Sequence, residues 1–190
     1  MARICPLLTS DHASPGAGRS AHVMTDRRFF PSELLTVHAK LDEHFFVHQE
    51  HVLERRMSEA ELTLVRYVRL LTLHMRHEEE LLLPLYARAE PPRRYPLVLF
   101  TGQHQRMREL LAALQGRVSA LASQSRMHAR DVIELLDSER TYKHLSEHHD
   151  GAERQALFPT LDRVLASAEE LNHVERCLSE WLDLERKLMA

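Results

Sequence analysis

Cysteine is scarce in this sequence, and long apolar runs are missing. Its 190 residues include only two cysteines, Cys5 and Cys177. Two distant cysteines exclude a disulfide framework and a cysteine-based zinc motif, and they suit a reducing compartment. No apolar run approaches the roughly 20 residues that a membrane span needs, and the N-terminus lacks the apolar segment of a signal peptide. We therefore expect a cytoplasmic protein with no membrane partner.

The sequence also lacks a strong charge of either sign. Its formal net charge is -3, which gives no electrostatic reason to expect a nucleic acid or an anionic membrane as partner. Hydrophobic residues make up 44% of the chain, enough to form the core of one domain of this length. We predict one compact domain that binds no nucleic acid.

Isoleucine and glycine are rare as well, and this balance favours helices over strands. The chain has two isoleucines and five glycines against 32 leucines. We predict an all-α protein. The 14 histidines are the feature that the composition does not explain, because histidine is neither a strong helix former nor a usual core residue.

Hydrophobic periodicity and helix-start signals predict five helical segments after a flexible arm at residues 1–29. The helices are expected at about 31–57, 58–90, 96–121, 129–165 and 167–190. The second and fifth would begin at capping boxes, SEAE at 58–61 and SAEE at 167–170. We predict an up-and-down four-helix bundle at 30–166 with an additional C-terminal amphipathic helix at 167–190. Trp181 in that last helix either covers one side of the bundle or binds a partner. The partner would be another protein or a second copy of this chain.

A repeated motif marks two of these helices. His74 and Glu78 in the first copy align with His149 and Glu153 in the second. The copies read HMRHEEELLLP at 74–84 and HDGAERQALFP at 149–159. A histidine and a glutamate four residues apart share one face of a helix, so each copy directs an imidazole and a carboxylate to the same point.

Each copy of the motif ends in a proline, Pro84 or Pro159. Proline removes the hydrogen bond to the carbonyl four residues earlier, here Glu80 and Gln155. We therefore predict a bend in each helix beyond the turn that carries the histidine and glutamate.

The two other long helices each carry one histidine on the apolar face that is expected to point into the bundle. Together the four helices supply six candidate metal ligands. They are His38, His74, Glu78, His104, His149 and Glu153. Buried charges in a helical core are costly unless they are paired or bind metal. Mixed imidazole and carboxylate donors suit iron, manganese or zinc. Six donors exceed the need of one tetrahedral zinc, and bridging carboxylates would allow two metals with open coordination positions.

With these motifs the sequence resembles the hemerythrin-like family, also called the HHE cation-binding domain, over about residues 34–165. The resemblance implies a four-helix bundle around a non-haem centre of two iron ions. It assigns the bridging positions to Glu78 and Glu153. It assigns the terminal positions to His38, His74, His104 and His149.

Two features distinguish the sequence from the oxygen-carrying hemerythrins. Arg108 stands where those proteins have a second histidine one turn after His104, and the last pair, His149 and Glu153, is four residues apart rather than five. Both features are similar to the bacterial iron-centre repair proteins with four histidines and two glutamates. The resemblance implies that the protein handles or senses a small diatomic ligand such as oxygen or nitric oxide, peroxide, or iron itself, without reversible oxygen carriage.

Several neighbouring residues are expected to lie outside the site. Glu79 and Glu80 project away from Glu78 around the helix and are predicted to be surface charges. His77 and His148 lack a carboxylate four residues later, so neither is expected to be a ligand. His148 with His144 is predicted to form a titrating surface pair.

Three further side chains share the stripe of the candidate ligands. His48 is either a residue that supports the ligands or a packed core residue, and the sequence favours neither. Tyr67 and Tyr142 lie one heptad before His74 and His149. We predict that both tyrosines are core aromatics with partnered hydroxyls.

Two other metalloprotein classes are excluded by spacing. A ferritin-like site needs two E-x-x-H pairs on separate helices, and the chain has one, Glu170 with His173. A zincin needs H-E-x-x-H, but Leu81 occupies the last position after His77 and Glu78. Two alternatives stay open: a metal-regulated interaction or sensor bundle without turnover, and a site for a single metal.

Overall fold

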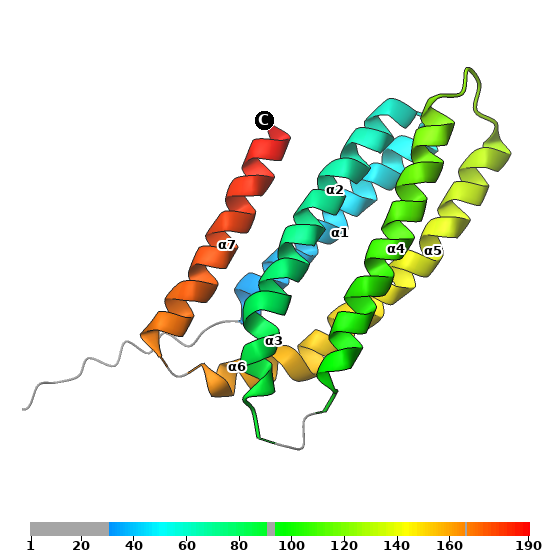
Figure 1. The fold of residues 1–190 in the computed structure, drawn as a ribbon. Coiled ribbons are helices and arrows are strands. Elements are labelled where there is room, and N and C mark those ends of the chain that lie inside the picture. Colours follow the sequence, from blue (N-terminus) through cyan, green and yellow to red (C-terminus); the bar gives the residue numbers. More distant parts are fainter. Residues whose placement is uncertain (1–30, 91–93, 166) are drawn as a thin grey trace, which may run out of the picture.

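The computed structural model describes residues 31–90, 94–165 and 167–190, and in these ranges it contains helices and short turns but no strand. The all-α prediction is therefore confirmed for the described part of the chain (Figure 1). The predicted N-terminal arm and Cys5 lie outside the described residues. Among the described helices, none combines the length and the apolar character needed to cross a bilayer.

Helix α1, Pro31–Leu53, ends earlier than the sequence predicts, and α2, Met57–His77, follows after a tight turn. Arg55 has a positive φ of 57°, and the backbone N–H of Arg56 donates to the carbonyl of His51 at 2.9 Å. A left-handed residue with this hydrogen bond is a common helix stop. The capping box predicted at Ser58 is wrong, because Arg56 precedes the first turn of α2 and makes no side-chain cap hydrogen bond.

Two of the helical rods change their winding at the repeated motif. α2 continues through a π-helical turn, η1 (Glu78–Leu82), into α3 (Leu83–Ala87). The second rod runs from α5 (Ala129–Ala152) through the π-helical turn η2 (Glu153–Leu157) into α6 (Phe158–Val164).

A π-helical turn lies in each rod near the predicted bend, and it begins earlier, at the glutamate itself. The N–H of Leu83 donates to the carbonyl of Glu78, and the N–H of Phe158 donates to that of Glu153. A proline that follows directly cannot donate a hydrogen bond and crowds the preceding turn. The wider turn relieves that crowding and keeps the rod continuous.

The other helices begin where the sequence predicts. α4, Leu97–Ala122, follows the extended Pro96. α7, Ala168–Met189, starts at the predicted capping box: the backbone N–H of Glu170 donates to Ser167 Oγ at 3.1 Å, and the N–H of Ser167 donates to the Glu170 carboxylate at 3.3 Å.

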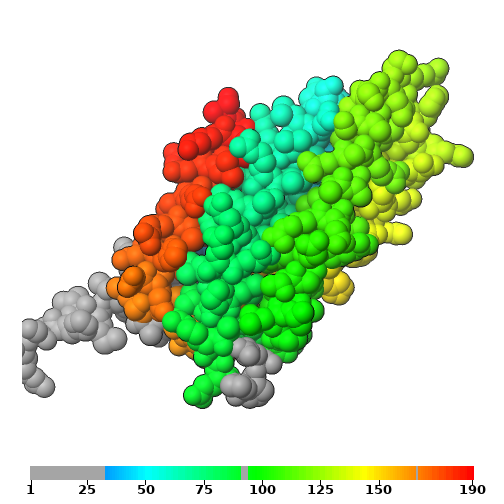
Figure 2. Space-filling view, viewed as in Figure 1, coloured from blue at the N-terminus to red at the C-terminus, as the bar shows by residue number. Residues whose placement is uncertain are grey.

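The helices pack lengthwise (Figure 1). α1 lies along α2, α2 along α4, and α4 along α5, while α3 and α6 meet at one end. α7 lies along α2 and also touches α1. The space-filling view shows α7 seated directly against the α2 surface (Figure 2). The last helix is therefore an integral part of the packed structure.

The core consists of two buried apolar clusters, one toward each end of the packed helices. The first includes Leu41, Leu70, Met107, Leu135 and Trp181. The second includes Leu34, Leu82, Phe100, Leu157 and Leu161. The candidate ligands lie between the two clusters; on α4, for example, His104 stands between Phe100 and Met107. Any charge there has apolar side chains on both sides along the helices.

Candidate metal centre

The structure brings the six predicted side chains together in the interior. α1 contributes His38, α4 contributes His104, and each of the two motif-bearing rods contributes one histidine and one glutamate. All six side chains are buried, and the exposed fraction of none exceeds 5%. In each rod the ligand histidine lies in the last turn of the α-helix, and the glutamate opens the π-helical turn.

The four imidazoles form two pairs. The Nε2 atoms of His38 and His74 are 3.1 Å apart, and so are those of His104 and His149. One possible metal-binding group contains the first pair and the other contains the second, and in each group the ligand atoms lie within 4.8 Å of one another. Both groups share the same two carboxylates.

Glu78 and Glu153 each extend one oxygen toward each histidine pair. Glu78 Oε1 lies 3.2 Å from His74 Nε2, and its Oε2 lies 3.1 Å from His104 Nε2. Glu153 repeats the arrangement: Oε2 lies 3.2 Å from His38 Nε2 and Oε1 lies 3.2 Å from His149 Nε2. Both carboxylates therefore lie between the two histidine pairs.

The four carboxylate oxygens are the strongest sign that this cluster is made for cations. All four are buried, and none accepts a hydrogen bond from the described part of the chain. A buried carboxylate oxygen without a donor costs several kcal/mol in an apolar surrounding. Such oxygens fit a metal ion, which is the partner that the donor set would satisfy at once.

Two of the histidines are oriented by side chains outside the cluster. His104 Nδ1 donates to Glu79 Oε1 at 2.8 Å, and His149 Nδ1 donates to Gln103 Oε1 at 3.1 Å. A neutral ring that donates through Nδ1 presents the lone pair of Nε2 to the interior. The Nε2 atoms of His104 and His149 lie 3.1 Å apart, so a proton or a metal ion has to lie between two lone pairs that face each other in this way.

The prediction that Glu79 is a surface charge is wrong. Its carboxylate is only partly exposed and accepts hydrogen bonds from both His104 and Arg108, each at 2.8 Å. Its helix has a wider π-helical turn here, so consecutive side chains are rotated by less than in an α-helix. Glu79 reaches α4 for that reason. Glu80, by contrast, is exposed as predicted.

Burial and the charges of neighbouring side chains shift the pKa values of the cluster. Burial lowers the pKa of His38 to about 4 and that of His74 to about 3, so both rings are neutral near pH 7. Burial, and then the charge of Glu78, raises the pKa of Glu153 well above its usual value. Burial opposes a charged His149, but Glu153 raises the pKa of that ring well above its usual range. The His149 and Glu153 pair thus retains a proton that a metal ion would displace.

The other histidines of the helices do not enter the cluster. His77 Nε2 lies 3.0 Å from Glu180 on α7, and His148 is exposed, so neither shares the ligand positions. His144 is exposed too, which agrees with the predicted surface pair. His48 is fully buried, and its ring nitrogens contact Glu139 Oε1 at 3.1 Å and the carbonyl of Ala60 at 2.8 Å, neither of which belongs to a candidate ligand.

The paired tyrosines behave as predicted. Tyr67 and Tyr142 are buried, and their hydroxyl groups bond to each other across the interior. Both rings also pack against Phe45. Burial raises the pKa of Tyr142 well above its usual value, so its hydroxyl stays protonated at neutral pH.

The arrangement can hold one metal ion or two, and the donor types exclude a preference for calcium or magnesium. No family model matches this sequence. Comparison with curated proteins finds no match. Comparison with solved structures likewise finds none. The buried cluster of histidines and glutamates is therefore the feature that indicates the chemistry of this protein.

Proposed function

We propose that this protein is a non-haem di-iron protein of the hemerythrin-like type, in which an up-and-down four-helix bundle of α1, α2, α4 and α5 encloses the metal centre and α7 is an addition. The observation that carries the proposal is the position of Glu78 and Glu153. Each carboxylate directs one oxygen to each of the two histidine pairs. That is the placement that two bridging ligands require.

In this proposal His38 and His74 would hold one iron and His104 and His149 would hold the other, with Glu78 and Glu153 available to both. Each metal then has four protein donors. Structural zinc is satisfied by four ligands, whereas iron accepts more and keeps positions open for an external ligand. Iron is the best fit for this reason and because of the resemblance of the motifs; manganese and zinc are the other metals that the donor types allow.

The surrounding residues keep the centre dry and correctly oriented. Apolar clusters on both sides exclude water, which strengthens electrostatic interactions within the site. Glu79 and Gln103 hold the rings of His104 and His149 with Nε2 inward. When bound, two ferrous ions would supply electrons and open positions for a small ligand such as nitric oxide, oxygen or peroxide.

Arg108 supports a role other than oxygen carriage. It occupies the position one turn after His104, and its guanidinium donates to Glu79 at 2.8 Å, so α4 offers no second histidine there. Arg108 instead fixes the carboxylate that orients His104. The resemblance to the iron-centre repair proteins also favours a role other than reversible oxygen carriage.

We expect the ferrous protein to bind nitric oxide as a stable adduct and to be oxidised by oxygen without recovery on deoxygenation. The test is absorption and electron paramagnetic resonance spectroscopy of anaerobically loaded protein, first with nitric oxide and then, in a separate sample, with oxygen. Repeated reversible oxygenation would contradict the prediction. Indifference to both gases would contradict the proposed function.

A metal-regulated sensor without turnover is the second candidate. It is favoured by the contact between α7 and the helix that carries His74: Trp181 Nε1 donates to the carbonyl of Leu70 at 3.0 Å. A shift of α2 on metal binding would therefore move α7 as well, and a protein partner or a second copy of the chain would bind at α7. Turnover of the gas during the same spectroscopy favours an enzyme, and a lasting adduct favours the sensor.

A further inference from the structure

A narrow cavity lies between α7 and the end of α2 and reaches the candidate metal centre. Its inner end is formed by the buried His74 and Glu78. At its outer end Leu81, Cys177 and Leu178 are only partly buried. The volume open to a water-sized molecule is about 20 Å³, enough for one such molecule.

The wall of this cavity between its two ends is largely apolar. It includes the apolar Val37, Val174 and Trp181, and also His77. Burial, followed by the nearby charge of Glu180, raises the pKa of the Cys177 thiol, so this side chain is uncharged as well. Ions and strongly hydrated molecules lose their water on entering such a space without gaining partners. A small uncharged molecule does not pay that penalty.

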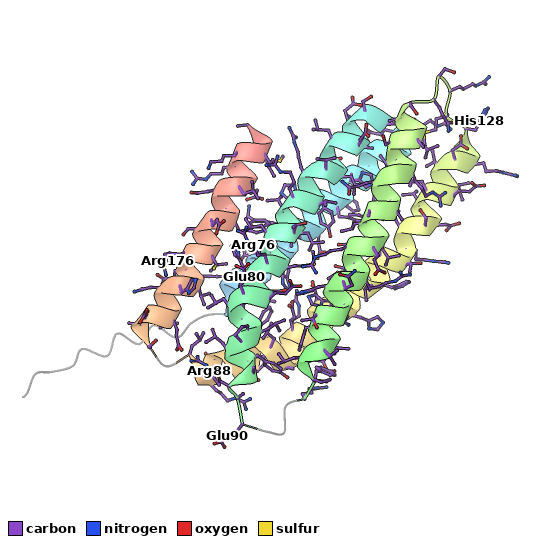
Figure 3. The ribbon with its side chains drawn as sticks, in the orientation of Figure 1. Arg76, Glu80, Arg88, Glu90, His128 and Arg176 are labelled. Atoms are coloured by element: carbon purple, nitrogen blue, oxygen red, sulfur yellow. The ribbon has the colours of Figure 1, made fainter. Side chains whose placement is uncertain are left out.

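α7 is held firmly where it forms one wall of the cavity. Besides the hydrogen bond of Trp181, Glu180 accepts from Arg76 at 2.8 Å and lies 3.0 Å from His77 Nε2. Further along α7, Glu185 accepts from Lys40 at 2.8 Å. Figure 3 shows Arg76 and Arg176 on the neighbouring helices α2 and α7. Because these contacts join α7 to α1 and α2 at several positions, we expect the size of its side chains to limit which molecules can pass through the cavity.

We propose that this cavity is the route by which a small uncharged ligand reaches the centre, and that Cys177 sets its width. The destination of the ligand rests on the proposed function, but the permeability of the cavity does not. Cys177 is the small side chain on the α7 wall at the outer end. A larger side chain there would close a space that holds about one water-sized molecule.

The permeability can be measured in the metal-free protein, because Trp181 lines the cavity and is the one tryptophan of the chain. The probe is dissolved oxygen, which quenches tryptophan fluorescence on contact. We expect Cys177→Phe to reduce the lifetime-corrected quenching constant by about tenfold relative to Cys177→Ala, the effect of a barrier higher by ~1.4 kcal/mol. The matched control is Asn172→Phe, which adds the same ring at an exposed position of α7.

Cys177→Met provides a second test where the phenylalanine variant does not fold, since it lengthens the side chain without adding a ring. Equal quenching in the alanine and the larger variants would overturn the proposal. Stopped-flow mixing of the ferrous protein with nitric oxide tests whether the cavity leads to the centre. The Cys177→Phe and Cys177→Met variants should bind nitric oxide more slowly than Cys177→Ala at unchanged iron content. A wild-type protein that binds no nitric oxide contradicts the proposed function alone, because the quenching result still decides the route.

Discussion

Replacing Glu153 or Glu78 by alanine is expected to lower iron affinity by more than about a hundredfold, since even residues that only orient a ligand cost 10- to 100-fold when removed. Each of these carboxylates faces both histidine pairs, so in the proposed centre either change would remove an oxygen from each of two metal positions. Four neutral imidazoles would then share one carboxylate against two divalent charges. The measurement is iron per chain after anaerobic loading with ferrous iron.

Matched controls lie next to the ligands. Glu80 and Glu147 are exposed, so alanine at either position should leave iron content unchanged and alter stability by no more than about 0.5 kcal/mol. His148→Ala serves in the same way for the neighbouring ligand His149, because His148 is exposed. His77→Ala should also keep its iron, although it removes the contact with Glu180 and is no control for stability. Iron loss in these controls, with retention in the Glu78 and Glu153 variants, would mean that the wrong helix face has been assigned to the centre.

Glu79→Ala should give an intermediate result in the same experiment. Its carboxylate orients His104 and is held by Arg108, but it faces the outer nitrogen of the ring. Affinity should therefore fall by about 10- to 100-fold, as for other residues that support a ligand. This graded response distinguishes a supporting residue from both a ligand and a surface charge.

Glu139→Ala is expected to destabilise the protein by about 1–3 kcal/mol, the usual cost of leaving a buried hydrogen-bonding group without its partner. Glu139 is fully buried and contacts His48 Nε2 at 3.1 Å, and it accepts from Gln49 at 2.8 Å. His48 Nδ1 donates to the carbonyl of Ala60 at 2.8 Å, so its ring cannot turn to find another partner without breaking that bond. Chemical denaturation of the metal-free protein measures the loss.

Two further variants test whether the loss of stability comes from the contact between Glu139 and His48. Glu134→Ala, at an exposed position of the same helix, should change the free energy of unfolding by no more than about 0.5 kcal/mol. The double variant His48→Leu with Glu139→Leu should recover much of the stability, because apolar replacement of a buried pair is often neutral. A single Glu139→Ala variant as stable as the native protein would show that the pair contributes nothing.

The clustering of the six candidate ligands is predictable from the sequence because its strongest signal is local. A histidine and a glutamate four residues apart share a helix face whatever the rest of the fold does, and the repeated motif supplies two such pairs. The structure buries both pairs and brings His38 and His104 to them. That these six residues bind metal stays a prediction until metal is measured.

What the sequence missed depends on contacts between helices or on departures from α-helical geometry. Glu79 was assigned to the surface from an ideal helix, but the π-helical turn and the neighbouring α4 bring it to His104. The partner of His48 lies on α5, far along the chain, and no periodicity identifies it. The start of α2 was placed at Ser58 from a capping pattern, although the left-handed Arg55 shows that the chain turns earlier.

The central claim is that this cluster holds two metal ions, and an anaerobic titration with ferrous iron tests it most directly. Metal-free protein is titrated while bound iron is separated from free iron and counted per chain. We predict an end point of two iron ions per chain in the native protein, since the two ligand groups share both carboxylates yet use different histidine pairs. An end point at one iron per chain, or no binding, would contradict the account.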